Sequence, residues 1–136
     1  MKMVETKKIM LAAEDEAVRK MVARVLESVG YTVTQVSSSR QAVEVLVQCQ
    51  PDLAILDLPT PDREGWAAME SVARLQPGTP VVALTTWSNQ QDQARRVGVA
   101  ALFEKPLDPF SLLASIRELL TGSQRRLLEH SVTAPC

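Results

Sequence analysis

Five short apolar runs alternate along the chain with amphipathic stretches of helical length, and this alternation restricts the fold more than any other feature. The runs are nearly unbroken in hydrophobicity, as expected of strands that are covered on both faces. They are Ile9–Ala13, Thr32–Val36, Leu53–Leu56, Val81–Leu84 and Ala101–Phe103. This β-α repetition predicts an α/β fold with a parallel sheet, right-handed crossovers and helices on both faces.

The number of β-α units predicts how the strands are ordered. Five units favour a flavodoxin-like, doubly wound sheet with strand order 2-1-3-4-5. In such a sheet, ligands bind at the carboxyl edge, where the strand order reverses between the first and third strands. We expect this domain to cover residues 1–121 and residues 122–136 to form a linker or C-terminal tail. Residues 124–130 either begin a connecting helix or belong to a disordered end.

Charge and composition argue against several classes of partner. The 136 residues carry a formal net charge of -1 without a basic stripe, so we expect neither nucleic acid nor a membrane surface to bind this chain directly. No apolar run reaches membrane-spanning length, and the first residues lack the apolar stretch of a signal peptide. Cys49 and Cys136 form no metal or redox motif, so a reduced, cytoplasmic setting is expected.

Chemically active side chains follow four of the five predicted strands. Glu14–Glu16 come after the first strand, Asp57 ends the third, Thr85 follows the fourth and Lys105 the fifth. Carboxylates bind a hard cation such as Mg²⁺ and can attack phosphorus, while lysine offers a compact positive charge to a phosphoryl oxygen. Taken singly, each residue can also be a helix cap, a turn residue or a solvated charge. Their convergence at one edge favours a phosphoryl-transfer site.

The segments that carry these residues resemble the receiver domains of response regulators in two-component signalling. The similarity runs from about Lys8 to Leu120. Each motif is weak alone, but four in order at matching spacing are specific. The opening strand and helix, the phosphoacceptor strand and loop, the switch-hydroxyl strand and the lysine strand correspond to Ile9–Arg19, Pro51–Pro61, Val81–Thr85 and Phe103–Leu107.

The resemblance implies a role for each matching residue. Asp57 is the expected phosphoacceptor, charged by a histidine kinase or a phosphotransfer protein. Thr85 is expected to rotate toward the phosphoryl group, and Lys105 to pair with it. The peptide bond before Pro106 is a candidate for the cis form. Pro59 matches the position whose backbone carbonyl binds the metal in the family, and proline keeps that carbonyl. Such a domain switches partner binding and is not an enzyme, beyond slow self-dephosphorylation.

The chain departs from the family at the metal site. Receiver domains usually carry two acids after the first strand, and counting back from Arg19 places these positions at Ala13 and Glu14. We therefore expect weakened Mg²⁺ binding by Glu14, Asp57 and the Pro59 carbonyl. A shift of one residue would instead make Glu14 and Asp15 the acidic pair, although Asp15 is better explained as a helix cap.

A second departure concerns the output of the switch. The family couples the switch hydroxyl to an aromatic side chain on the fifth strand, where this chain has Leu102. Phe103 should face the other side of the sheet by strand alternation. Trp87, Leu102 and Phe110 form a candidate apolar surface for a partner or a homodimer, on the fourth helix, fifth strand and fifth helix. Local packing of Phe110 on its own helix is the alternative.

Three other functions compete with a phosphorylation switch. A pseudo-receiver that binds partners without phosphorylation is favoured by Ala13 and Leu102. An aspartyl-phosphate hydrolase of the haloacid-dehalogenase type wants a second acid two residues after its nucleophile, and Pro59 occupies that place. A nucleotide-binding enzyme wants a glycine-rich loop after the first strand, which this chain lacks.

Overall fold

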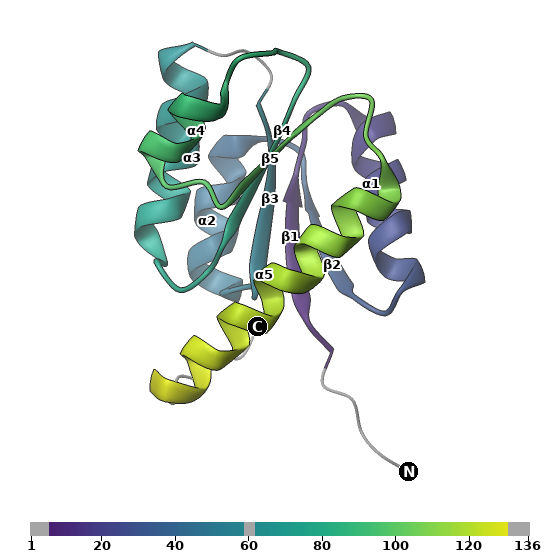
Figure 1. Cartoon of the computed structure of the whole chain (residues 1–136), viewed down its shortest axis with the longest axis vertical. Helices are drawn as coiled ribbons and strands as arrows, with labels where there is room; N and C mark the ends of the chain where they lie inside the picture. Colours follow the sequence, from purple (N-terminus) through teal and green to yellow (C-terminus); the bar gives the residue numbers. More distant parts are fainter. Residues whose placement is uncertain (1–5, 59–61, 131–136) are drawn as a thin grey trace.

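The computed structural model describes residues 6–58 and 62–130, and for residues 39–40 and 122–130 it describes the backbone alone. It contains one parallel sheet of five strands in the order β2-β1-β3-β4-β5, which confirms the predicted flavodoxin-like fold (Figure 1). The strands are β1 (Lys8–Ala12), β2 (Thr32–Val36), β3 (Leu53–Leu58), β4 (Val81–Thr85) and β5 (Ala101–Glu104). The helices are α1 (Glu16–Ser28), α2 (Ser39–Cys49), α3 (Arg63–Leu75), α4 (Gln91–Val97) and α5 (Pro109–His130).

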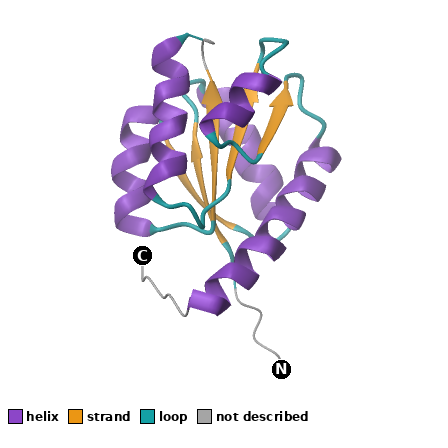
Figure 2. Cartoon of the chain, turned by 60° about the vertical axis from the view of Figure 1, so that its left-hand side comes forward, coloured by secondary structure: helices purple, strands orange, loops and turns teal. Residues whose placement is uncertain are grey.

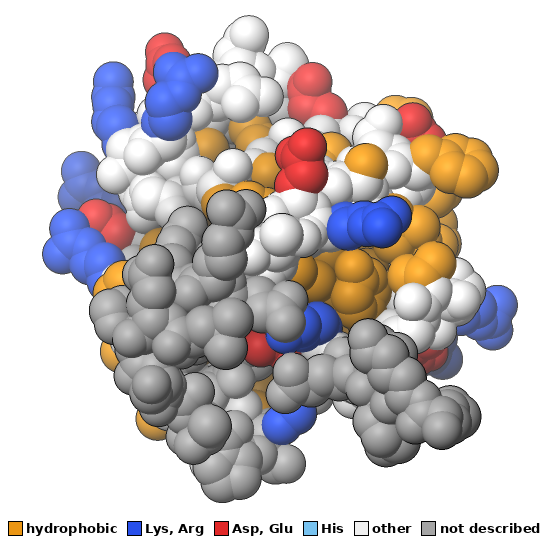
Figure 3. Space-filling view, turned by 60° about the horizontal axis from the view of Figure 1, so that its bottom comes forward, with side chains coloured by type: hydrophobic (Ala, Val, Ile, Leu, Met, Phe, Trp, Pro, Cys, Tyr) orange, Lys and Arg blue, Asp and Glu red, His pale blue; other side chains and the backbone are white. Residues whose placement is uncertain are grey.

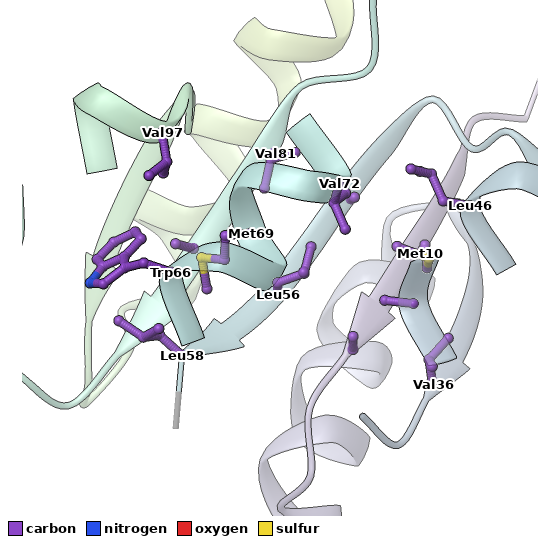
Figure 4. Close-up of a cluster of buried hydrophobic side chains, with 14 of the residues drawn as sticks. Met10, Val36, Leu46, Leu56, Leu58, Trp66, Met69, Val72, Val81 and Val97 are labelled. Atoms are coloured by element: carbon purple, nitrogen blue, oxygen red, sulfur yellow. The ribbon is translucent and has the colours of Figure 1, made fainter. Parts of the chain in front are cut away.

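The sheet separates two hydrophobic cores. Alternate residues of each strand point to opposite faces, so Met10 and Ala12 join the core under α2, α3 and α4, while Ile9 and Leu11 join the core under α1 and α5. Figure 4 shows the first of these cores, where Trp66 lies among side chains of α3, α4 and β3. Burial on both faces explains why the strand segments are nearly continuous in hydrophobicity.

The helix ends follow from local sequence. The carboxylate of Asp15 accepts hydrogen bonds from the backbone of Ala17 and Val18 at the start of α1, which satisfies donors that the helix cannot pair internally. At the other end of α1, Gly30 directly follows the Val29 cap with φ 103°. Glycine accepts that left-handed conformation without steric cost.

Several element boundaries differ from the sequence prediction, and two of the differences are the largest. The third strand continues to Leu58, because Leu58 pairs in register with Thr85, so Asp57 lies within β3. The last helix continues through residues 122–130, which favours the connecting-helix alternative over a disordered end. A glycine inside a helix costs only about 1 kcal/mol relative to alanine, so Gly122 need not end α5. The strands point toward one edge in Figure 2, and α5 ends near the opposite edge (Figure 1).

The described surface carries few extended features. On the face in Figure 3, basic and acidic side chains of the described residues are interspersed. No helix among residues 6–58 and 62–130 is long and apolar enough to cross a membrane. Cys49 is disulfide-bonded, which differs from the reduced state expected for it, and Cys136 lies outside the described residues.

Candidate functional site

Asp57 and Lys105 form a buried ion pair at the carboxyl edge of the sheet. The Lys105 Nζ lies 2.6 Å from the Asp57 Oδ1, and their side chains are only 18% and 9% exposed. The register explains the meeting, because Asp57, Leu84 and Phe103 are aligned across three strands and point to the same face. Lys105 comes two residues after Phe103 and therefore projects to that face as well. The lysine that the sequence analysis expected to pair with a phosphoryl group therefore contacts the expected phosphoacceptor itself.

The backbone around Lys105 fixes the position of its side chain. The Lys105 N–H donates to the Thr85 carbonyl at 2.7 Å. The Lys105-Pro106 peptide bond is cis, as the resemblance implied. A lysine tethered to the end of β4 and followed by a proline turn has its ammonium directed back over the sheet edge toward Asp57.

Among the described residues, Lys105 is the cation that forms an ion pair with the Asp57 carboxylate. Its Oδ1 is fully buried, and no described donor is aligned on it as a hydrogen bond, although the Lys105 ammonium is in ion-pair contact. A buried carboxylate with so few partners is costly to leave unpaired. The site therefore depends on Lys105 for charge balance and has unfilled capacity for a further cation.

Thr85 is fully buried, and its hydroxyl is engaged with the following loop. The Thr85 Oγ1 accepts a hydrogen bond from the Trp87 N–H at 2.9 Å. Thr85 pairs in register with Leu58 and so points to the sheet face opposite Asp57. The same loop is held at its far end by a hydrogen bond from the Trp66 Nε1 to the Gln90 Oε1. The structure thus shows Thr85 beside Asp57 in the sheet, with its hydroxyl bound to the loop.

Ala13, the residue that the resemblance places at the first acidic position, is a buried alanine next to Asp57. Ala12 pairs with Leu56 in register, so Ala13 continues the row beside Asp57. Ala13 is 2% exposed, and its N–H donates to the Val36 carbonyl. A methyl group therefore fills the place where most receiver domains offer a carboxylate.

The three acidic residues after Ala13, Glu14–Glu16, differ in the contacts that they make. Asp15 caps α1 through its Oδ1, as the helix-cap interpretation expected. Glu16 forms an ion pair with Lys20 at 2.9 Å, and the Lys20 hydrogen bond and charge hold the Glu16 pKa below its ordinary value. Glu14 is exposed and has no hydrogen bond or ion pair with any described residue. Only Glu14 is thus available to a metal from this segment.

The donor set fits Mg²⁺ in part. No group of three or more His, Cys, Asp or Glu side chains within the described ranges is placed to hold a metal ion. Two carboxylates, from Glu14 and Asp57, are hard oxygen ligands of the kind that Mg²⁺ prefers, and Mg²⁺ commonly keeps several water ligands. Pro59, the predicted carbonyl ligand, lies outside the described residues.

Arg19 contacts the backbone at the end of β1. Its Nη1 donates to the Ala13 carbonyl at 2.7 Å, and the side chain is partly buried. It forms no ion pair with any residue that the structure describes. The sequence contains no signal for this contact, because it joins α1 to the end of β1 across a turn whose shape is set by folding.

The predicted apolar surface is present in part. Phe103 packs with the α1–α5 core and Leu102 with the opposite core, which confirms the predicted alternation. Trp87 is 46% exposed. Phe110 is 83% exposed, so its local packing on α5, the alternative considered, is wrong.

A family model of the response regulator receiver domain matches residues 9–117. The chain belongs to this family. Its fold and strand order agree with that assignment.

Curated relatives match this chain over part of their own length. PdtaR, a transcriptional regulatory protein of Mycobacterium tuberculosis, is 34% identical over 110 residues, which cover 78% of this chain and 53% of PdtaR. PhoB of Pseudomonas aeruginosa, a phosphate regulon transcriptional regulatory protein, is 31% identical over 118 residues, covering 83% of this chain and 52% of PhoB. The first curated relatives are matched over 52% and 26% of their own length, so the chain spans about half of them or less.

Solved structures show the same fold. A CheY-like response regulator receiver domain protein from Methanospirillum hungatei has a TM-score of 0.82 and 25% sequence identity, and the match covers 90% of this chain and 99% of that one. A putative pilus assembly-related protein from Burkholderia pseudomallei has a TM-score of 0.76 and 27% identity, with 86% of this chain and 91% of that chain covered.

Proposed function

We propose that this receiver domain accepts a phosphoryl group on Asp57 from a phosphohistidine of a kinase or phosphotransfer protein. The observation that carries the proposal is the buried ion pair between Asp57 and Lys105 at 2.6 Å. A nucleophilic carboxylate needs an exposed side for the donor and a fixed cation for the charge that arrives. At the edge of the sheet, Lys105 supplies the cation, and the 9% of the Asp57 side chain that is exposed is the side open to a donor.

In the phosphoryl transfer, one bond forms on this protein and one bond breaks on the donor protein. A lone pair of an Asp57 carboxylate oxygen forms the new O–P bond while the P–N bond to the donor imidazole breaks. The electron pair of that bond stays on the imidazole nitrogen, which then takes a proton from solvent. Lys105 stays charged throughout and contacts a phosphoryl oxygen. The protein modifies itself in this step and turns over no separate substrate.

Mg²⁺ is the cofactor that we propose for this step, bound by Glu14, Asp57 and the Pro59 carbonyl. When bound, it supplies positive charge to the oxygens of the transferring group. Since Ala13 brings no carboxylate to the site, we propose that the ion is held weakly and keeps most of its water ligands.

The response to phosphorylation is a change in which partner binds. We propose that Thr85 releases the Trp87 N–H and turns its hydroxyl toward the phosphoryl group, so that the β4–α4 loop shifts. The new charge on Asp57 then stabilises one of two forms of the domain. Leu102 follows this movement without the ring that the family uses, so the change on β5 is smaller than in most receivers.

A direct test is incorporation of one phosphoryl group from a small acyl phosphate in the presence of Mg²⁺, followed by mass spectrometry. We expect the mass gain in the native chain and none in Asp57→Asn. Asp52→Asn serves as the control, because Asp52 is an aspartate at the other end of β3 that accepts from the Lys8 N–H. No gain in the native chain under any condition would favour the pseudo-receiver alternative.

The exposed aromatics Trp87 and Phe110 are proposed to form the surface that joins two copies of the phosphorylated domain. Burial of large aromatic side chains is a main source of interface energy. Light scattering of the phosphorylated protein should show dimers in the native chain and fewer in Phe110→Ser. Val47→Ser, a matched change at a 55% exposed position of α2, should leave the dimer intact. Monomers in both phosphorylation states of the native chain would remove the dimer proposal.

A further inference from the structure

The Trp66 indole joins α3 to the loop between β4 and α4. Its Nε1 donates to the Gln90 Oε1 at 3.2 Å. Trp66 is only 4% exposed and packs with Leu58 and Val97 in the core under α2, α3 and α4 (Figure 4). An indole N–H in such a place needs an acceptor, and Gln90 supplies it. The indole is thus held by the core, and the loop is the part that can move away from it.

The Gln90 side chain bridges the loop and α3 and does not cap its own helix. Gln90 occupies the N-cap position of α4, and within the described chain its side chain makes no capping hydrogen bond there. Its Nε2 donates to the Ser88 carbonyl at 3.1 Å, while its Oε1 accepts from the indole. Asn89, directly before it, has φ 61°, a left-handed conformation that asparagine adopts more readily than most residues. The loop therefore presents this amide to α3.

The loop is held at both of its ends. At its start the Trp87 N–H donates to the Thr85 Oγ1 at 2.9 Å, and at its end Gln90 accepts from Trp66. Residues 86–90 alone connect β4 to α4, so a shift at the first contact is passed to the second through a short segment. Leu58, which packs with Trp66, pairs in register with Thr85. Both contacts are therefore anchored on the same part of the sheet.

Resting on the proposed function, we infer that the Trp66–Gln90 hydrogen bond is a latch that holds the unphosphorylated form and opens when Asp57 is phosphorylated. In the proposed switch Thr85 releases the loop, which shifts. The indole stays in the core, so its bond to Gln90 breaks. Both partners line a cavity of about 370 Å³ between α3 and α4. Opening of the latch carries the change to the α3–α4 side of the domain, while Leu102 limits the change on β5.

The latch and phosphorylation oppose each other. A hydrogen bond that exists in one of two forms favours that form by its net contribution, which is about fivefold in the equilibrium between them for a neutral pair. Phosphorylation by a small donor proceeds through the competent form, so its rate follows the population of that form. Removal of the latch should therefore speed phosphorylation. A substitution that only damages the fold has no reason to do so.

Gln90→Leu should be phosphorylated by a small acyl phosphate with Mg²⁺ about fivefold faster than the native chain. Trp66→Phe keeps a ring without the N–H and should act in the same direction. The double variant should add nothing further, because both changes remove one bond. Gln93→Leu is the matched control and should stay within about twofold, since Gln93 lines the same cavity but accepts from Arg96.

Gln90→Ser separates the latch from the stability of α4. Serine is too short to reach the indole, and it is a preferred N-cap residue. We expect the same rise in phosphorylation rate as in Gln90→Leu, in a protein whose α4 is at least as stable. Circular dichroism confirms that each variant is folded.

Acrylamide quenching of Trp66 reads the latch without any phosphodonor. In a Trp87→Phe background Trp66 is the one tryptophan of the chain. Its quenching should rise about twofold when Asp57 is phosphorylated, because the indole edge loses the loop that covers it. The donor should cause no rise in Asp57→Asn. In Gln90→Leu the quenching should already be raised before any phosphodonor is added.

Two results would overturn the latch and leave Asp57 as the phosphoacceptor. One is quenching of Trp66 that phosphorylation does not change. The other is a phosphorylation rate at or below the native rate in both Gln90→Leu and Gln90→Ser. If the native protein is never phosphorylated, the proposed function fails. Equal quenching in Gln90→Leu and the native chain then overturns the latch as well, whereas higher quenching in Gln90→Leu supports it.

Discussion

The two halves of the carboxyl edge differ in how firmly they are built. On the lysine half, at the ends of β4 and β5, Thr85 is fully buried and Lys105 is tied to β4 through its backbone. On the metal half, at the end of β1, Ala13 offers no ligand and Glu14 is an exposed side chain without a partner. The half that handles the phosphoryl group is thus preorganised, while the half that would hold the metal is sparse.

A receiver site can therefore keep its nucleophile while it lacks much of the set of carboxylates that would bind the metal. The ion pair of Asp57 with Lys105 is positioned by strand register and by the backbone contact of Lys105 with the end of β4. Metal binding needs several carboxylates at once, and two of the three acids after β1 are committed to a cap and an ion pair. Four substitutions and one pH change test whether the two halves of the edge differ in this way, beginning with the substitution of largest expected effect.

Lys105→Gln should disable the lysine half. We expect phosphorylation by a small acyl phosphate to fall about 100-fold, because one preorganised charge stabilising a transition state is worth about 3 kcal/mol. The free energy of unfolding should drop by about 2 kcal/mol, since the buried Asp57 carboxylate loses its partner. Chemical denaturation and phosphorylation kinetics measure the two effects. In the Asp57→Asn background the stability loss should disappear, and a loss that persists would show that Lys105 stabilises the fold through other contacts.

Ala13→Asp should rebuild the metal half. The added carboxylate lies next to Asp57 in register and is expected to tighten Mg²⁺ binding about tenfold, because affinity for hard cations rises with the number of charged ligands. Isothermal calorimetry reads the change directly. Ala13→Asn is the matched control without the charge and should have a smaller effect. An unchanged affinity in Ala13→Asp would mean that Glu14 and Asp57 do not form the metal site.

Thr85→Val tests the switch hydroxyl on the lysine half with little change of shape. The Trp87 N–H loses its acceptor, so we expect a loss of about 1 kcal/mol in the free energy of unfolding. Phosphorylated Thr85→Val should also show a smaller change in Trp87 fluorescence than the native chain, measured in the Trp66→Phe background. A full-sized fluorescence change would separate the loop movement from the hydroxyl.

Leu102→Tyr restores a ring at the β5 position without touching either half of the edge. The phosphorylation rate should stay within about twofold, because Leu102 packs in the core under α2, α3 and α4 and not beside Asp57. The fluorescence response of Trp87 to phosphorylation should grow as the ring follows Thr85. Leu102→Met, which keeps an aliphatic side chain, should leave the response unchanged.

Lowered pH tests the ion pair of Glu16 with Lys20 on the metal half. The Lys20 hydrogen bond and charge lower the Glu16 pKa in the folded state from its ordinary value of 4.5. The stability that this pair contributes is present above that value and is lost as pH falls through the folded pKa. We expect a small loss of stability in this acid range that is absent in Lys20→Gln. An identical pH dependence in both proteins would show that the pair contributes nothing measurable.

Much of the site was predictable because it follows from where strands end. In a parallel sheet all carboxyl ends meet at one edge, so Asp57, Thr85 and Lys105 could be brought together from sequence alone. Asp15 as a helix cap followed from its place directly before an apolar helical pattern. The end of α5 was less predictable, because a glycine such as Gly122 often follows the end of a helix but can also lie within one.

The sequence by itself determined the fold, its strand order and the residues at the carboxyl edge, because hydrophobic periodicity and strand ends are properties of short segments. Only the tertiary structure decided how these residues are paired: the contact of Lys105 with Asp57, the hydroxyl of Thr85 held by the loop, the exposure of Phe110 and the placement of Arg19 on the Ala13 carbonyl. Such pairings depend on side-chain directions and on turns between elements, and local sequence does not specify either one.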